Sequence, residues 1–113
     1  MKIEATQQAG VCIVSVSGSV DSLTSDEAES FLDQQIERGE TRLVLDLTDV
    51  NYMSSSGLRV LMGTLKSTRQ HKGDLYLAGL QNHIHELLDL AGFTSIFKIY
   101  STSTEAVAAF SSR

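Results

Sequence analysis

The sequence lacks several features that define common classes of protein. Among its 113 residues Cys12 is the one cysteine, so neither an internal disulfide nor a metal site of the CxxC type can form. Proline is absent too, which excludes no function. No apolar run approaches the roughly 18 residues of a membrane span, and residues 1–8 do not have the pattern of a signal peptide, so we expect a cytoplasmic protein without membrane insertion. Lys and Arg number 9 against 14 Asp and Glu, a net charge of −5 that argues against nucleic acid as a partner.

The composition that remains is typical of one domain spanning residues 1–113. A hydrophobic fraction of 42% is enough to fill a single core in a chain of this length. After an opening hairpin that turns at Ala9 and Gly10, strand-like and helix-like segments alternate, which predicts an α/β fold with a partly parallel central sheet. The expected strands cover residues 3–8, 11–16, 42–47, 74–78 and 96–100. The expected helices run from Thr24 to Gly39, from the serines at 54–56 to about Gln70, from Asn82 to Gly92, and from Thr104 to Phe110.

Residues with known preferences for helix ends mark the boundaries of these helices. Thr24 followed three residues later by Glu27 forms the pattern of a capping box. Asn82 and one of the residues 101–103 are expected to cap the third and fourth helices. Gly73 is expected to close the second helix.

The stretch from Asn51 to Leu58 joins a strand-like run to a helix-like run, and three consecutive serines lie at the join. The start of a helix exposes unpaired backbone N–H groups and a partial positive charge. Ser54, Ser55 and Ser56 could therefore cap the helix, hold an anion or receive a phosphate. Spacing alone does not decide between these roles.

The sequence gives weak support for a hydrolase, a nucleotide-binding site or a metal site. The serines do not lie in a GxSxG motif, which argues against a hydrolase nucleophile, and neither a GxxxxGK[ST] loop nor a GxGxxG loop is present. His83 and His85 lie two residues apart, so on a helix they point in different directions and we expect no metal site. The basic residues Lys66, Arg69 and Lys72 fall in the last turns of a helix, where the helix dipole favours cations.

The serine stretch and its flanks resemble a known family. Residues 43–47 followed by Val50, Tyr52, Met53, Ser55, Ser56, Gly57, Leu58, Arg59, Val60 and Leu61 are similar to the signature of STAS domains, and specifically of bacterial anti-sigma-factor antagonists. Gly18, Val20 and Asp21, residues 77–80 and residues 87–93 match other parts of the family in the same register. The resemblance implies the STAS fold, with a mixed central sheet of about five strands packed with about four helices.

Members of this antagonist family are binding proteins without catalytic activity or cofactor. The resemblance implies that this chain binds an anti-sigma factor that is also a serine kinase, and that binding frees the sigma factor. The family's phosphorylated serine falls on Ser55, with Ser54 and Ser56 as secondary candidates. Phosphorylation would switch the protein off, and a PP2C-like serine phosphatase would restore it. Ser54 stands where the family usually has an acidic or amide residue.

The same resemblance implies a contact surface around the serines. The loop at residues 21–24 is expected beside Ser55, and the expected partner-binding residues are Asp21, Ser22, Thr24, Met53, Ser54, Ser56, Gly57, Leu58 and Arg59. An alternative is a STAS subunit of a transporter or lipid-trafficking complex, in which the serine would serve as a helix cap. The sequence specifies no oligomeric state.

Overall fold

Five strands and four α-helices alternate along the chain in a computed structural model that describes residues 1–112. The strands are β1 (Lys2–Gln8), β2 (Val11–Val20), β3 (Arg42–Met53), β4 (Asp74–Ala78) and β5 (Lys98–Tyr100). The helices are α1 (Ser25–Glu37), α2 (Ser55–Gln70), α3 (Asn82–Leu90) and α4 (Ser103–Ser111), with a short 3-10 helix η1 (Phe93–Ser95) before β5. The predicted mixed sheet with about four helices is confirmed.

The strands form one sheet in the order β1-β2-β3-β4-β5, which is also their order in the chain. The first pair is an antiparallel hairpin, and the other three pairs are parallel. Ala9 and Gly10 turn the hairpin with φ angles of 53° and 76°, as a two-residue turn between twisted strands requires. Helices α1, α2 and α3 make the crossovers between the parallel strands.

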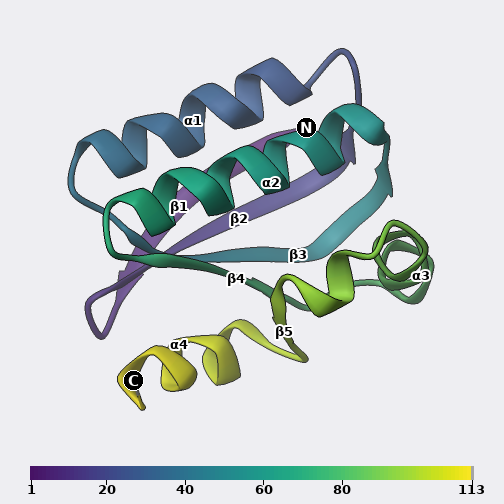
Figure 1. Cartoon of the computed structure of the whole chain (residues 1–113). Coiled ribbons are helices and arrows are strands. Elements are labelled where there is room, and N and C mark those ends of the chain that lie inside the picture. The colour runs from purple at the N-terminus through teal and green to yellow at the C-terminus, as the bar shows by residue number, and fades with distance from the viewer. Residues whose placement is uncertain (113) are drawn as a thin grey trace.

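Both faces of the sheet are covered, and alternate residues of β2, β3 and β4 point to the two cores. Helices α1 and α2 lie on one face and α4 lies on the other (Figure 1). On the α1 and α2 face, Leu45 and Leu77 are among the buried residues of the larger core. On the α4 face, Tyr76 stacks on Phe110 with ring centroids 3.9 Å apart. This two-sided burial explains the nearly continuous apolar runs of β3 and β4.

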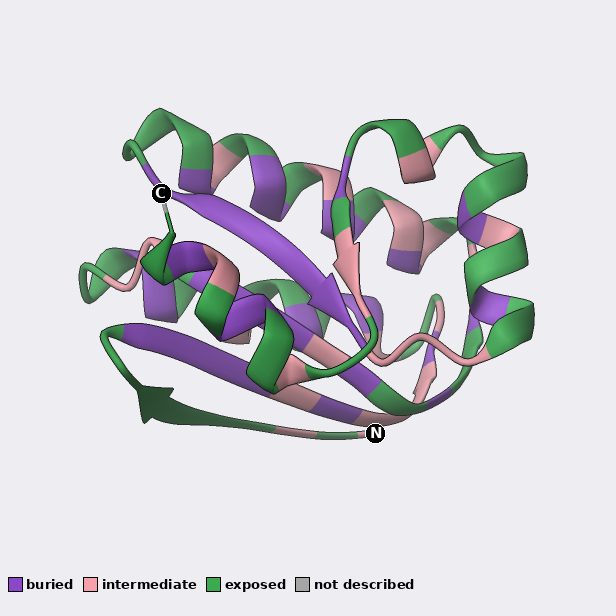
Figure 2. Ribbon diagram, turned by 90° about the horizontal axis from the view of Figure 1, so that it is seen from below, coloured by how far each residue is buried: buried purple, intermediate pink, exposed green. Residues whose placement is uncertain are grey.

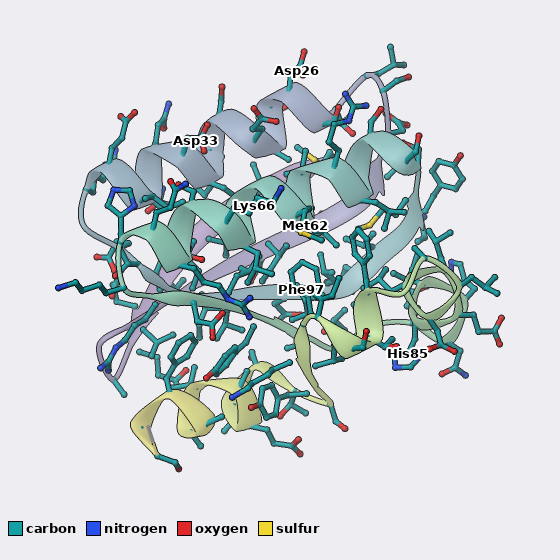
Figure 3. The ribbon with its side chains drawn as sticks, in the orientation of Figure 1. Asp26, Asp33, Met62, Lys66, His85 and Phe97 are labelled. Atoms are coloured by element: carbon teal, nitrogen blue, oxygen red, sulfur yellow. The ribbon has the colours of Figure 1, made fainter. Side chains whose placement is uncertain are left out.

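The outer strand β1 is largely exposed, whereas β4 is buried throughout and β3 is buried mainly in its first half (Figure 2). Acidic residues of α1 are exposed as well, and Asp26 and Asp33 point away from the sheet (Figure 3). None of the helices in residues 1–112 has the length and apolar character that crossing a bilayer requires. Cys12 is fully buried in β2.

Two strand boundaries differ from the prediction. Strand β3 does not end at Leu47 but continues to Met53, because β2 follows it through two irregularities of the pairing, at residues 15–17 and 18–19. Strand β5 is shorter than expected and begins at Lys98. The N–H groups of Ile96 and Phe97 donate to the carbonyl of Phe93 instead, so these residues belong to the turn after η1.

Two predicted helix caps are wrong, and one is confirmed. Thr24 precedes α1, but its hydroxyl donates to the carbonyl of Ser19 at 2.8 Å and makes no cap hydrogen bond. Gln81, not Asn82, is the residue before α3, and it makes no side-chain cap either. Thr102 caps α4 by accepting the N–H of Glu105 at 3.1 Å.

The end of α2 depends on two adjacent residues. Lys72, not Gly73, has the left-handed conformation after the helix, with φ of 63°. Gly73 is needed for space, because a Cβ there would lie 1.9 Å from the carbonyl oxygen of Thr41. Gly73 lies at the helix end, as expected. A glycine is needed there because the backbone of Thr41 packs closely against it, and not because of a left-handed conformation.

Candidate functional site

The serine stretch lies where two neighbouring strands end and a helix begins. Val20 at the end of β2 pairs with Met53 at the end of β3. The next residue, Ser54, donates its backbone N–H to the carbonyl of Val20 at 3.0 Å. The β2–α1 loop and the first turn of α2 consequently share one end of the molecule, on the right in Figure 1.

Ser54 is the cap of α2. Its backbone is extended, with φ of −96° and ψ of 179°, and its hydroxyl oxygen accepts the N–H of Ser56 at 3.2 Å. Its carbonyl accepts the N–H of Leu58 at 3.1 Å, the first hydrogen bond of the helix. The capping role that the sequence left open among three serines therefore falls on Ser54.

The other two hydroxyls have different surroundings. Ser55 is the first residue of the helix and is exposed, and within residues 1–112 its hydroxyl has no hydrogen-bond partner. Ser56 is partly buried, and its hydroxyl accepts a hydrogen bond from the Arg59 guanidinium at 3.3 Å. Of the three, Ser55 has the hydroxyl most accessible to an external reactant.

Gly57 allows α2 to begin this close to the sheet. A Cβ at this position would lie 2.6 Å from the Met53 side chain and 3.0 Å from the carbonyl oxygen of Val20. Any other residue would push the first turn of the helix away from the strand ends. Gly57 thereby fixes the position of Ser55 relative to β2 and β3.

The β2–α1 loop is held by the carboxylate of Asp21. One carboxylate oxygen accepts the N–H groups of Leu23 at 2.9 Å and of Thr24 at 3.2 Å. The Thr24 hydroxyl oxygen in turn accepts the N–H of Asp21 at 3.0 Å. These reciprocal hydrogen bonds between Asp21 and Thr24 hold the loop in one defined conformation.

The structure brings the expected contact residues to one end of the molecule, but at different depths. Met53 and Gly57 are buried beneath the surface. The exposed or partly exposed members are Asp21, Ser22, Thr24, Ser54, Ser56, Leu58 and Arg59. Sequence reasoning missed Leu23 and Tyr52, whose side chains are 90% and 54% exposed. Their apolar character gave no signal, because the exposure of a leucine in the loop before a helix is visible only in the structure.

The histidines are not arranged for metal binding. His83 Nε2 lies 2.6 Å from the carbonyl oxygen of Asn51, which ties the start of α3 to the end of β3. Within residues 1–112, no three His, Cys, Asp or Glu side chains are grouped closely enough to hold a metal ion. The chemistry available at the serine stretch is that of hydroxyls at a helix N-terminus.

Comparison with known proteins identifies the family. The chain is 38% identical over 110 residues to BtrV of Bordetella bronchiseptica, named as a candidate anti-sigma factor antagonist, covering 97% of this chain and 95% of BtrV. It is 34% identical over 108 residues to the anti-sigma F factor antagonist of Paenibacillus polymyxa, covering 95% and 92% of the two chains. The crystal structure of an anti-sigma factor antagonist from Mycobacterium paratuberculosis superimposes with a TM-score of 0.88 at 26% identity, over 96% of this chain and 92% of that one. Residues 2–106 match the model of the STAS domain, and the chain therefore belongs to the STAS domain family.

Proposed function

We propose that this chain is an anti-sigma factor antagonist controlled by phosphorylation of Ser55. In the unphosphorylated form it binds an anti-sigma factor/serine kinase in the cytoplasm through the surface around the start of α2, and the sigma factor is freed. The kinase phosphorylates Ser55 and ends binding, and a PP2C-like serine phosphatase restores it. The chain contributes no catalysis and needs no cofactor. Membership of the STAS family and the names of the curated relatives support the antagonist role.

The observation that carries the choice of Ser55 is the division of roles among the serines. Ser54 is engaged in capping α2 and the hydroxyl of Ser56 accepts from Arg59, whereas the Ser55 hydroxyl is exposed. A kinase needs an accessible hydroxyl that can leave its present surroundings at low cost. Ser55 meets this condition without loss of a hydrogen bond that holds the fold.

The energetics favour a switch that changes binding and leaves the fold intact. A phosphate on Ser55 adds about −1.5 to −2 charges, and the helix N-terminus stabilises such a charge by roughly 0.3–1 kcal/mol. A partner carboxylate or nucleotide phosphate about 4 Å away would be repelled by on the order of 4 kcal/mol at an effective dielectric constant of about 20. That repulsion corresponds to roughly a thousandfold loss of affinity. The effect on the interface is therefore the larger one.

The proposed contact residues act in two ways. The exposed members touch the partner: Asp21, Ser22, Thr24, Ser54, Ser56, Leu58 and Arg59. Met53 and Gly57 are buried and position the first turn of α2 beneath that surface. A substitution at Gly57 would thus weaken binding by displacing Ser55.

Phosphorylation can be tested with purified proteins. The chain is incubated with ATP and each ATP-binding serine kinase of the anti-sigma class encoded in the source genome, and intact mass is measured. We expect one added phosphate on the wild type and on Ser101→Ala, a control at an exposed serine before α4, and none on Ser55→Ala. Equal labelling of wild type and Ser55→Ala would refute the assignment of Ser55.

Binding is tested on the same set of kinases by calorimetry, with ADP in place of ATP. We expect the unphosphorylated chain to bind one of them and the phosphorylated chain to bind roughly a thousandfold more weakly. Equal affinity of the two forms would show that phosphorylation does not control binding. Binding to none of the kinases would refute the antagonist role itself.

A further inference from the structure

Large apolar side chains are exposed at four positions of the described chain, and two of these positions flank the serine stretch. Leu23 lies in the loop between β2 and α1, and Tyr52 lies near the end of β3, just before the serine stretch; their exposures are 90% and 54%. The other two, Leu90 and Ile96, lie at the end of α3 and after η1. Single exposed apolar residues are common, but two that flank one candidate site are well placed to contact a partner that binds there.

The fold holds Leu23 outward at a fixed position. The Asp21 carboxylate accepts the N–H groups of Leu23 and of Thr24, so the backbone on both sides of the leucine side chain is fixed. The Thr24 hydroxyl donates to the carbonyl of Ser19 at 2.8 Å and joins the loop to β2. A side chain presented by a rigid loop loses little conformational entropy on binding, which favours affinity.

Tyr52 belongs to the same unit. It pairs with Ser19 across β2 and β3, and Ser19 is the residue to which the Thr24 hydroxyl is bound. Its neighbour Asn51 is held by His83 of α3 through a 2.6 Å contact. The backbone at Leu23 and at Tyr52 is therefore held close to the end of β3, from which Ser54–Ser56 continue.

We propose that Leu23 and Tyr52 are the apolar anchors of the docking surface, and that they insert into apolar pockets of the anti-sigma factor/serine kinase beside the position that faces Ser55. This inference rests on the proposed function and names the residues that supply the binding energy. Well-packed aromatic and apolar side chains at the centre of an interface dominate its affinity. Asp26 and Glu27 are exposed in the first turn of α1, right after the loop, so the pockets would have a basic rim.

The position of the anchors gives phosphorylation a second effect besides repulsion. Seating two apolar side chains next to Ser55 removes water from their surroundings. A phosphate at that place would have to lose part of its hydration for the anchors to seat, and burial of an uncompensated charge is costly. The phosphorylated chain would then fail to dock even against a partner surface without negative charge.

The test compares two leucines with nearly equal exposure. The affinities of Leu23→Ala, Tyr52→Ala and the control Leu90→Ala for the kinase that binds wild type are measured by calorimetry, since Leu90 is 89% exposed but lies at the far end of α3. We expect losses of roughly tenfold or more for Leu23→Ala and Tyr52→Ala, and less than about twofold for Leu90→Ala. Circular dichroism and the melting temperature are expected to stay at wild-type values for all three.

The outcomes separate this inference from the function on which it rests. If wild type binds a kinase and Leu23→Ala and Tyr52→Ala bind it as tightly, the anchors are refuted and the antagonist role stands. An equal loss in Leu90→Ala would also refute them, because the effect would not be specific to this surface. Absence of binding by wild type to every kinase would overturn both.

Discussion

The hydroxyl of Ser54 accepts the backbone N–H of Ser56 at 3.2 Å, so the residue that caps α2 is the neighbour of the serine proposed to be phosphorylated. Capping and modification are thus divided between adjacent side chains. One can be changed while the other is kept, which makes the two roles experimentally separable.

Substitution of Ser54 is expected to lower the stability of the fold, whereas substitution of Ser55 is expected to leave it nearly unchanged. Ser54→Ala removes the cap and should lower the free energy of unfolding by about 1 kcal/mol. Ser55→Ala removes no hydrogen bond and should change it by less than about 0.5 kcal/mol. Urea denaturation followed by circular dichroism measures both. A larger loss in Ser55→Ala than in Ser54→Ala would show that the cap has been assigned to the wrong serine.

A phosphate on Ser55 is expected to interact with Arg59, which lies one helical turn further along α2 and is exposed. Residues four apart on a helix are neighbours, and a nearby cation favours the dianionic phosphate. The second pKa of the phosphate should therefore lie below its usual value of about 6, and Arg59→Gln should raise it. Phosphorus NMR titration of the chain carrying phosphoserine at position 55 measures this pKa.

The matched control for Arg59 is Lys66, another exposed cation of the same helix, two turns further from the serines (Figure 3). Lys66→Gln should leave the phosphate pKa at the wild-type value. An equal change in both variants would indicate a general effect of net charge and would contradict a direct interaction with Arg59.

Burial, with a smaller contribution from the negative charge of Glu40, raises the pKa of the Cys12 thiol to about 11. In the unfolded chain this thiol ionises near its ordinary value of 9.0. Between these two values the unfolded chain binds fewer protons than the folded one, so stability is fully present below pH 9 and falls as the pH rises toward 11. Cys12→Ala should remove this part of the alkaline decline, as measured by urea denaturation at pH 8 and pH 10. An identical decline in the variant would show that other groups cause it.

The hairpin turn offers a stabilising substitution. Ala9 is exposed and has a φ of 53°, a conformation in which asparagine is tolerated better than alanine. Ala9→Asn should raise the free energy of unfolding by about 0.5–1 kcal/mol. Ala5→Asn, at an exposed position within β1, should have no such benefit because asparagine is disfavoured in strands. Thermal unfolding of both variants decides the point.

Much of the fold could be predicted from the sequence because its signals are local. Alternation of apolar runs with amphipathic segments predicted the five strands and the four α-helices in order but not η1, and the turn at Ala9 and Gly10 was correctly placed. Two of the differences arose where distant segments decide the outcome. Strand β3 extends to Met53 because β2 pairs with it, and Gly73 is required by the carbonyl of Thr41, thirty-two positions earlier.

The candidate site was predictable in place but not in detail. The sequence located three serines at a helix start, yet only the backbone geometry shows that Ser54 is the cap. Thr24 and Glu27 have the pattern of a capping box, but the Thr24 hydroxyl donates its hydrogen bond to the carbonyl of Ser19 and does not cap α1. The exposure of Leu23 follows from the hydrogen bonds of Asp21, which no periodicity encodes.

The identity of strand order in the sheet with strand order in the chain bears on how the protein folds. Every strand finds its partner among its immediate neighbours in the chain, so no pairing has to bring the two termini together. The β1–β2 hairpin closes over two residues, and each parallel pair closes over one intervening α-helix, with η1 in addition between β4 and β5. Because closure of short loops costs little entropy, such a sequence-local topology favours folding on the timescale of mixed α/β domains and not the slower one of sheets built from distant segments. The chain can therefore assemble progressively from its first hairpin, adding one strand and one helix at a time.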